Sequence, residues 1–498
     1  MKRYVAYVAY IALLSALAGC SSTGNQAPAT KALNLATMTL PQSLDPKDAN
    51  GSALPFFQAV YDTLIRREPD GGYSPMLATE WKHTGTEVAL TLRAGVTFDD
   101  GSPFDAKAVK ANLERFHKGG GAQAKTLDDV ESIDVADDTH VTLKLKQPNS
   151  AMLFYLSDAA GLMANPAAFA KGDALKTQPD GTGPYDLDQA STVIGTKWQF
   201  KRAAGYWGAK LPYDTVTMSY FDNETAIVNG LKTGQLNAAL IQDADQQISV
   251  EGRPGIKTVK QEFDFQGILL FDRAGAVTPQ LRDPKVRQAL NYAIDRQTML
   301  TKIRQGRGAV TGQVFGTTTQ AYKPELDTYY PFDQAKAREL LKDTGGFTLK
   351  LPRLPAIVSD ALAASLQTDL GAVGVKLVWE DVDQGSAIQR IFRDRAYSGM
   401  VMNMGQSSAD WVAVGELVVP GTFNMFGYTD DTVKKLLPAI KAKAAKEDLQ
   451  ALNQHLVEDG WFVPFYRMTY LHVSDGSVAI TPQDGMAVPS IYNYAPAG

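Results

Sequence analysis

Histidines, carboxylates and a single cysteine are the side chains with which this chain of 498 residues could do acid–base, nucleophilic or metal chemistry. No H-E-x-x-H, C-x-x-C or G-x-S-x-G pattern occurs, and the absence of the dipeptide Gly-Lys excludes a Walker A phosphate loop. The histidines are far apart and lack the context of a catalytic triad. They are His83, His117, His140, His455 and His472. Carboxylates are numerous enough to keep a glycosidase pair open, although no motif supports one.

The cysteine, Cys20, stands where a covalent modification is expected. Lys2 and Arg3 precede an apolar stretch at 5–17, which is shorter than the ~20 residues of a bilayer span but suits a signal peptide. The stretch ends in Leu-Ala-Gly-Cys, which resembles the bacterial lipobox, where cleavage precedes the cysteine and the sulfur then carries a diacylglycerol. The alternative is an inert buried thiol. We expect a signal peptide at 1–19, then a lipidated Cys20 and a flexible tether at 20–32.

The composition is that of an ordinary globular protein. Apolar residues make up 44% and charged residues 21%, which excludes a disordered or collagen-like chain, and the length suggests about three folding units. Lys and Arg total 49 against 54 Asp and Glu, with no basic block, so nucleic acid is not an expected partner. No internal stretch reaches 18 consecutive apolar residues, so we expect membrane contact only through the lipid.

Helix and strand periodicities alternate along the body of the chain. Apolar and polar residues alternate at 139–146, 216–220 and 375–379, which predicts half-buried strands. A capping aspartate before an apolar stripe indicates helix starts at Asp105, Asp283 and Asp333. A further helix is expected at 359–370, and the strand at 375 that follows it makes an order typical of α/β layering.

A series of motifs follows in a fixed order along the chain. The motifs are Ser43-Leu44-Asp45-Pro46, Val60-Tyr61-Asp62-Thr63-Leu64-Ile65, Pro75-Met76-Leu77-Ala78 with Trp81, Leu92-Arg93-Ala94-Gly95-Val96-Thr97-Phe98, Asp100-Gly101-Ser102-Pro103, Gly181-Thr182-Gly183-Pro184-Tyr185, Tyr206-Trp207 and Val286-Arg287-Gln288-Ala289-Leu290 leading to Ala293-Ile294-Asp295-Arg296. This series resembles the extracytoplasmic solute-binding protein family 5, the dipeptide-, oligopeptide- and nickel-binding lipoproteins of ABC importers. The similarity covers the chain from about residue 33 to its end.

The resemblance implies an α/β fold of two lobes, similar to periplasmic binding proteins, with a hinge and a subdomain inserted in lobe one. By this comparison the core of lobe one comprises 33–62, 181–270 and 467–498, the insert 63–180, and lobe two 271–466. The apolar run at 267–272 suits a hinge crossing. The implied function is capture of a short peptide or related amino compound by lobe closure and delivery to an ABC permease. Together with the missing catalytic motifs, the resemblance leads us to expect no enzyme activity, no cofactor, no metal-binding residues, a monomer, and a place in the periplasm or at the cell surface.

The resemblance also implies three ligand-binding segments, in which the aspartate of the last loop pairs with the α-ammonium of a peptide. The corresponding residues here are Asn50, Gly51, Ser52, Gln242, Asp243, Gln406, Ser407, Ser408, Asp410 and Trp411. Asp410 is therefore the expected partner of a ligand amino group, and the alternative is a solvated loop carboxylate. Trp411 could stack on a ligand ring or belong to the core.

Departures from the family pattern put a long peptide ligand in doubt. The stretch Met400-Val401-Met402-Asn403-Met404 places methionine where an oligopeptide binder carries an arginine for the ligand carboxylate. Arg393 is the candidate that replaces it, although Arg393 and its neighbours Arg390 and Arg395 could be surface residues. Two other functions stay open, a binding protein for a non-peptide ligand such as an oligosaccharide or sugar conjugate, and a lipid-anchored hydrolase. A hydrolase would turn its ligand over, whereas a binder would retain it stoichiometrically.

We predict that Cys20→Ser releases the protein from the membrane, because no other segment of the sequence is long enough to anchor it. Cell fractionation should find the variant in the soluble extracytoplasmic fraction and the wild type with membranes. A variant that still pellets with membranes would contradict lipid anchoring at Cys20.

Overall fold

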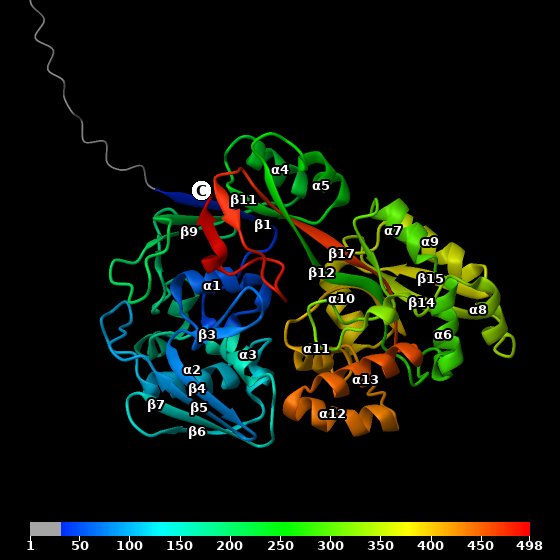
Figure 1. The fold of residues 1–498 in the computed structure, drawn as a ribbon, viewed down its shortest axis with the longest axis horizontal. Coiled ribbons are helices and arrows are strands. Elements are labelled where there is room, and N and C mark those ends of the chain that lie inside the picture. Colours follow the sequence, from blue (N-terminus) through cyan, green and yellow to red (C-terminus); the bar gives the residue numbers. More distant parts are fainter. Residues whose placement is uncertain (1–30) are drawn as a thin grey trace, which may run out of the picture.

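Two lobes lie side by side in the computed structural model, which describes residues 31–498 (Figure 1). The predicted signal peptide, Cys20 and nearly all of the predicted tether lie outside the described residues. Within 31–498, no helix is both long and apolar enough to cross a membrane. The mixed α/β, two-lobed architecture agrees with the predicted fold class.

A nine-stranded sheet runs through both lobes and joins them. Its order is β16–β12–β17–β11–β1–β10–β9–β8, and β13 pairs with β17 beside this path. β12 and β17 have 14 and 13 residues and pair antiparallel along nearly their whole length, so they form the connection between the lobes (Figure 1). The strands are β1 (Ala32–Thr37), β8 (Tyr185–Leu187), β9 (Lys197–Arg202), β10 (Thr215–Tyr220), β11 (Ala238–Ile241), β12 (Lys257–Leu270), β13 (Gly308–Val310), β16 (Gly399–Gly405) and β17 (Phe462–Ser474).

The first lobe adds an antiparallel sheet of order β4–β5–β7–β6, on which α2 packs. Asp105 caps α2, its Oδ1 accepting from the backbone N–H of Ala108 at 2.8 Å, as predicted. This sheet falls within the predicted insert at 63–180, but the lobe and insert boundaries stay predictions. The other elements of this lobe are β2 (Ile65–Arg67), β3 (Tyr73–Pro75), β4 (Ala78–Thr84), β5 (Glu87–Leu92), β6 (Val130–Val135), β7 (His140–Leu145), β18 (Val478–Ile480), β19 (Tyr494–Pro496), α1 (Leu54–Val60), α2 (Ala106–Lys118), α3 (Met152–Leu156), α4 (Glu224–Lys232) and α5 (Ala244–Val250).

The second lobe is built from a parallel strand pair and most of the longer helices. The strands β14 and β15 pair in parallel, with α9 as the crossover between them, which confirms the predicted helix–strand order. Asp283 and Asp333 cap α6 and α8, as their positions before apolar stripes predict. The elements are β14 (Phe347–Arg353), β15 (Val375–Asp381), α6 (Pro284–Ala293), α7 (Arg296–Ile303), α8 (Gln334–Leu341), α9 (Asp360–Gly371), α10 (Gln384–Ala387), α11 (Asp410–Leu417), α12 (Asp431–Lys443) and α13 (Lys446–Glu458).

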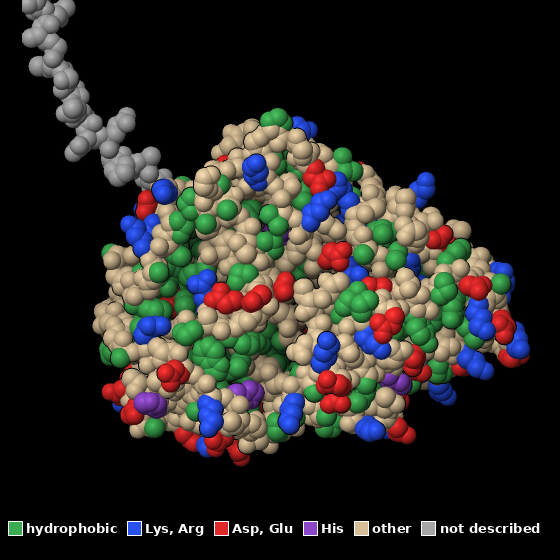
Figure 2. All heavy atoms as spheres, viewed as in Figure 1, with side chains coloured by type: hydrophobic (Ala, Val, Ile, Leu, Met, Phe, Trp, Pro, Cys, Tyr) green, Lys and Arg blue, Asp and Glu red, His purple; other side chains and the backbone are tan. Residues whose placement is uncertain are grey.

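The surface carries charges of both signs. Figure 2 shows acidic and basic side chains interspersed over both lobes on the face in view. This distribution fits the small net charge of −5, and this face offers no concentrated basic footprint for a phosphate backbone.

A buried carboxylate ties distant segments of the first lobe together. Asp62 is fully buried and accepts hydrogen bonds from Trp207 Nε1 at 2.8 Å, Tyr492 Oη at 2.9 Å, and Thr182 Oγ1 and Tyr206 Oη at 3.2 Å each. No lysine or arginine of 31–498 forms an ion pair with it. Burial therefore outweighs the hydrogen bonds and raises the pKa of Asp62 to about 7.

We predict that Asp62 makes the folded state less stable as the pH rises from 5 to 8. With a pKa of about 7 the folded carboxyl keeps its proton up to neutral pH, whereas in the unfolded chain it loses the proton near 3.8. At about 1.4 kcal/mol per pKa unit, the free energy of unfolding should fall by roughly 2–3 kcal/mol through this group. Denaturant unfolding at both pH values should show that Asp62→Asn lacks this part of the decrease. Equal decreases in wild type and variant would contradict the assignment.

Candidate functional site

A cavity of about 940 Å³ lies between the lobes. Its walls come from the first lobe, from the connecting strand β12 and from the second lobe around α11, so a ligand here would touch both lobes. Residues from these three parts include Gly51, Gln123, Lys125, Phe154, Tyr155, Asp158, Phe263, Arg395, Ser407, Val412, Glu416 and Asn424.

Two of the residues predicted for ligand binding line this cavity, Gly51 and Ser407. Asn50 precedes the first and caps the turn at 51–53, its Oδ1 accepting from the backbone N–H of Ala53 at 3.3 Å. The side chain of Ser52 lies outside the described part of the structure.

The neighbours of Ser407 have partners within the protein. Gln406 is buried and its Nε2 donates to the carbonyl of Val314 at 3.1 Å. Ser408 packs closely against Gly485 of the first lobe. If Gly485 were replaced by a residue with a Cβ atom, that atom would lie 2.5 Å from the backbone nitrogen of Ser408, which is too close. The loop at 406–408 thus closes one side of the gap between the lobes.

Asp410 begins α11 and faces away from the cavity lining. Its side chain is only 4% exposed, and its two oxygens accept from the backbone N–H groups of Gln320 at 3.2 Å and Ala321 at 3.0 Å. Burial raises the pKa of this carboxyl despite those bonds. Trp411 is buried in the core of the second lobe, with Lys441 Nζ 5.9 Å from its ring centroid. A ligand role for Asp410 stays a prediction, whereas its contacts here hold the segment at 320–321 to α11.

The remaining predicted residues lie outside the cavity lining. Asp243 caps α5, its Oδ1 accepting from the backbone N–H of Gln246 at 3.0 Å, and the N–H groups of Gln242 and Asp243 donate to the carboxylate of Glu224. Arg393 is exposed away from the cavity, and its near neighbour Arg395 lines the cavity instead.

The sequence prediction missed the charged side chains that do reach the cavity. They are Lys125 and Asp158 from the first lobe and Arg395 and Glu416 from the second. The signal that could have found Glu416 is the helical phase of 410–417, because the apolar residues Trp411, Val414 and Leu417 define the buried face and leave Glu416 on the other side. The first-lobe residues belong to a segment far away in the sequence, and no local pattern indicated that it meets α11.

An ion pair bridges the lobes at the outer edge of the cleft. Lys441 Nζ of α12 lies 2.8 Å from Asp129 Oδ2 of the first lobe, and the carbonyl of Lys441 accepts from the N–H of Ser150 at 2.7 Å. Gln147 and Asn149 also donate to Asp129. Although burial alone would raise the pKa of Asp129, these bonds and the charge of Lys441 lower it. The carboxylate is therefore ionised at neutral pH and holds the lobes together at this edge.

A second set of contacts between the lobes involves α5 and the residues after α7. Arg307 Nη2 lies 2.5 Å from Glu251 Oε2, and Arg304 Nη2 donates to the carbonyl of Gln242 at 2.9 Å. Arg307 also donates to Gln247 Oε1 at 3.2 Å. The hydrogen bond from Arg304 to the carbonyl of Gln242 therefore joins the two lobes, and Gln242 does not line the cavity.

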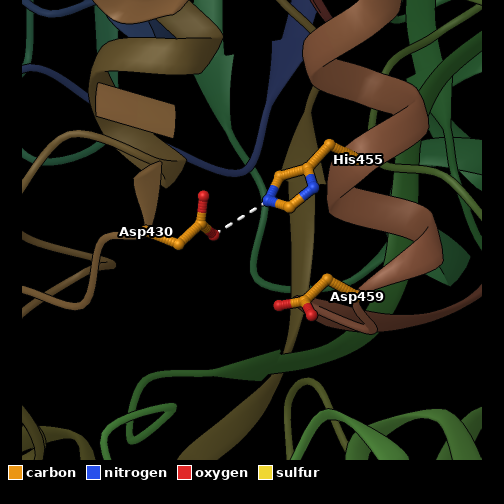
Figure 3. A group of neighbouring side chains, drawn as sticks. All are labelled: Asp430, His455 and Asp459. Carbon is orange, nitrogen blue, oxygen red and sulfur yellow. Dashed lines mark hydrogen bonds and ion pairs between the residues drawn. The ribbon is translucent and has the colours of Figure 1, made fainter. Parts of the chain in front are cut away.

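Asp430, His455 and Asp459 form a group whose ligand atoms lie within 4.8 Å of one another (Figure 3). His455 Nε2 is 2.8 Å from Asp430 Oδ2, while Asp430 Oδ1 caps α12 by accepting from the N–H of Val433. Asp459 pairs with the buried guanidinium of Arg287. Each of the three side chains therefore has a structural partner that joins α12, α13 and α6.

We predict that Asp410→Asn destabilises the protein by about 1–3 kcal/mol, because two backbone N–H groups lose a charged acceptor at a buried site. Denaturant unfolding measures the change, and Asp343→Asn, at an exposed position, is the control. An unchanged stability combined with a large loss of ligand affinity would instead support the role expected from the sequence.

Most of the chain is similar to known binding proteins. It matches the profile of bacterial extracellular solute-binding proteins, family 5 Middle, over residues 72–418. The glutathione-binding protein GsiB of Shigella dysenteriae serotype 1 is 30% identical over an aligned length of 450 residues, and the match covers 84% of this chain and 86% of that protein. The structure of DppA from Helicobacter pylori in complex with the peptide STSA has a TM-score of 0.79 at 21% identity, and covers 94% of this chain and 98% of its own. AgaA from A. tumefaciens R10, in complex with agropinic acid, has a TM-score of 0.78 at 22% identity, and covers 94% and 99%. The predicted resemblance is confirmed, and the chain belongs to family 5 of the bacterial extracellular solute-binding proteins.

Proposed function

We propose that this protein captures a short peptide or related amino compound between its lobes and delivers it to an ABC permease without changing it chemically. The observation that supports this most is the cavity of about 940 Å³ with walls from both lobes and the connecting strand. Its size is that of a site for a small ligand, not a long polymer. The glutathione-binding relatives make glutathione, a tripeptide, the first compound to test.

The proposal includes the place and state of the protein. We infer that it works as a monomer outside the cytoplasm, held near the membrane by a lipid on Cys20, in keeping with the extracellular family. Because β1 begins at Ala32, the part of the predicted tether before it, 20–31, would span at most about 43 Å if fully extended, so the two lobes would stay close to the membrane that carries the permease.

We predict that reduced glutathione raises the melting temperature in a concentration-dependent way, because a ligand that binds only the folded state adds RT ln(1 + [L]/Kd), about 2.7 kcal/mol at 100 times Kd. Small-angle scattering should show a smaller radius of gyration when the ligand is bound. Dipeptides, tripeptides and an oligosaccharide complete the panel, and mass spectrometry after incubation should recover the ligand unchanged. Turnover would favour the hydrolase alternative, and binding of the sugar alone would favour the non-peptide one.

A matched variant tests whether lobe closure is the motion involved. Lys441→Met removes the ion pair with Asp129 but changes no residue that lines the cavity. The unliganded variant should scatter as a wider particle than the wild type, and its affinity should fall because closure costs more. A radius of gyration that neither the ligand nor the variant changes would count against closure.

A further inference from the structure

The charged side chains of the cavity are unequally paired. Asp158 lies 3.5 Å from Arg67 and also accepts from the N–H of Ala159. The side chains of Lys125, Arg395 and Glu416 line the same cavity and make no hydrogen bond or ion pair with any other residue of 31–498. The cavity therefore presents two cations and one carboxylate that are free to pair with a ligand.

Glu416 owes its position to the helix that carries it. Val412, Gly415 and Glu416 follow one another at helical spacing on the cavity side of α11, while Trp411 and Leu417 are buried in the core. At about 100° per residue, Glu416 lies roughly 120° around the axis from Asp410. This difference in direction explains why the same helix turns one carboxylate into the protein and the other into the cavity.

The surroundings of Glu416 favour a cationic partner. Its side chain is exposed to the cavity, yet protein lies on both sides of it, and this desolvation raises the pKa of its carboxyl. Tyr155, on the first-lobe wall of the cavity, lies near Glu416. Burial is the main cause that raises the pKa of the Tyr155 phenol, and the negative charges of Asp129 and Glu416 raise it further. A desolvated carboxylate without a counter-ion is unfavourable, and an ammonium group bound between the lobes would relieve that cost.

Arg395 enters the cavity from an unusual backbone conformation. Its φ of 51° is in the left-handed region, which is strained for a residue other than glycine, and the segment before it, Ile388–Arg393, is a π-helix. Both features concentrate at functional sites in proteins. The guanidinium lies 6.0 Å from the ring centroid of Phe426 and has no carboxylate partner within 31–498.

We infer that Glu416 binds the amino group of the ligand and Arg395 one of its carboxylates, and that the ligand is a small amphoteric acid with one amino group and more than one acidic group. The inference rests on the proposed function and specifies its ligand class. The surplus of one cation among the three unpaired side chains matches a ligand of net charge −1, and Lys125 is available to the second acidic group.

Calorimetry with reduced glutathione as the probe tests this assignment. Glu416→Gln should weaken binding at least tenfold, whereas Glu447→Gln, an exposed position on α13 outside the cavity, should not. N-acetylated glutathione should bind the wild type at least tenfold more weakly than glutathione, but Glu416→Gln should hardly distinguish the two compounds, which completes a double-mutant cycle. A methyl ester of glutathione that blocks the carboxylate bound by Arg395 should bind the wild type more weakly than glutathione does. Arg395→Gln should bind that ester and glutathione with similar affinity.

The outcomes separate this inference from the proposed function. If the wild type binds glutathione and Glu416→Gln binds it equally well, or if acetylation weakens both proteins alike, the assignment of Glu416 is wrong while ligand capture stands. If Arg395→Gln still discriminates against the esters, the carboxylate is held elsewhere. If the wild type binds neither glutathione nor any peptide of the panel, the proposed function fails and this inference with it.

Discussion

The pairing of β12 with β17 is the constraint on which the rest of this structure depends. Their ladder runs from Lys257↔Ser474 in the first lobe to Leu269↔Phe462 in the second. At one end β11 continues the sheet, and at the other end β16 does. A ladder of backbone hydrogen bonds can twist but does not slide without breaking many bonds. The lobes can therefore rotate about these strands but cannot drift apart, and the cavity stays centred on them.

The end of β16 determines which residues reach the cavity between the lobes. β16 stops at Gly405, and the four residues 406–409 are enough to start α11 directly against the connecting strands. This short link explains why Ser407 and Gly405 reach the cavity. It also sets the phase of the helix, which turns Asp410 toward the segment at 320–321 and Glu416 toward the cleft.

Local signals in the sequence predicted much of the fold, because capping and alternation are properties of neighbouring residues. Asp105, Asp283 and Asp333 cap helices where the pattern placed them, and the alternation at 139–146 is a strand of the four-stranded sheet. The site was predicted less well. The resemblance located the loop near 406–411, but which carboxylate faces the cavity depends on helix phase. The approach of 122–160 to α11 depends on the arrangement of the lobes, and the left-handed Arg395 has no signature in the sequence.

The buried Asp62 has a consequence for the order in which the chain can fold. The core of the first lobe combines residues from 33 to 238 with Val478, Met486, Ile491 and Tyr494, and one hydrogen bond to Asp62 comes from Tyr492. An emerging chain that lacks this last segment has Asp62 without one of its four donors and part of the core uncovered. The buried core of the second lobe, as far as residues 31–498 describe it, takes its last members from β17, and only the partly buried Ala487 packs on it from the segment after that strand. The lobe that is synthesised first must therefore complete its packing last, and an exported chain would remain partly open until its final residues have crossed the membrane.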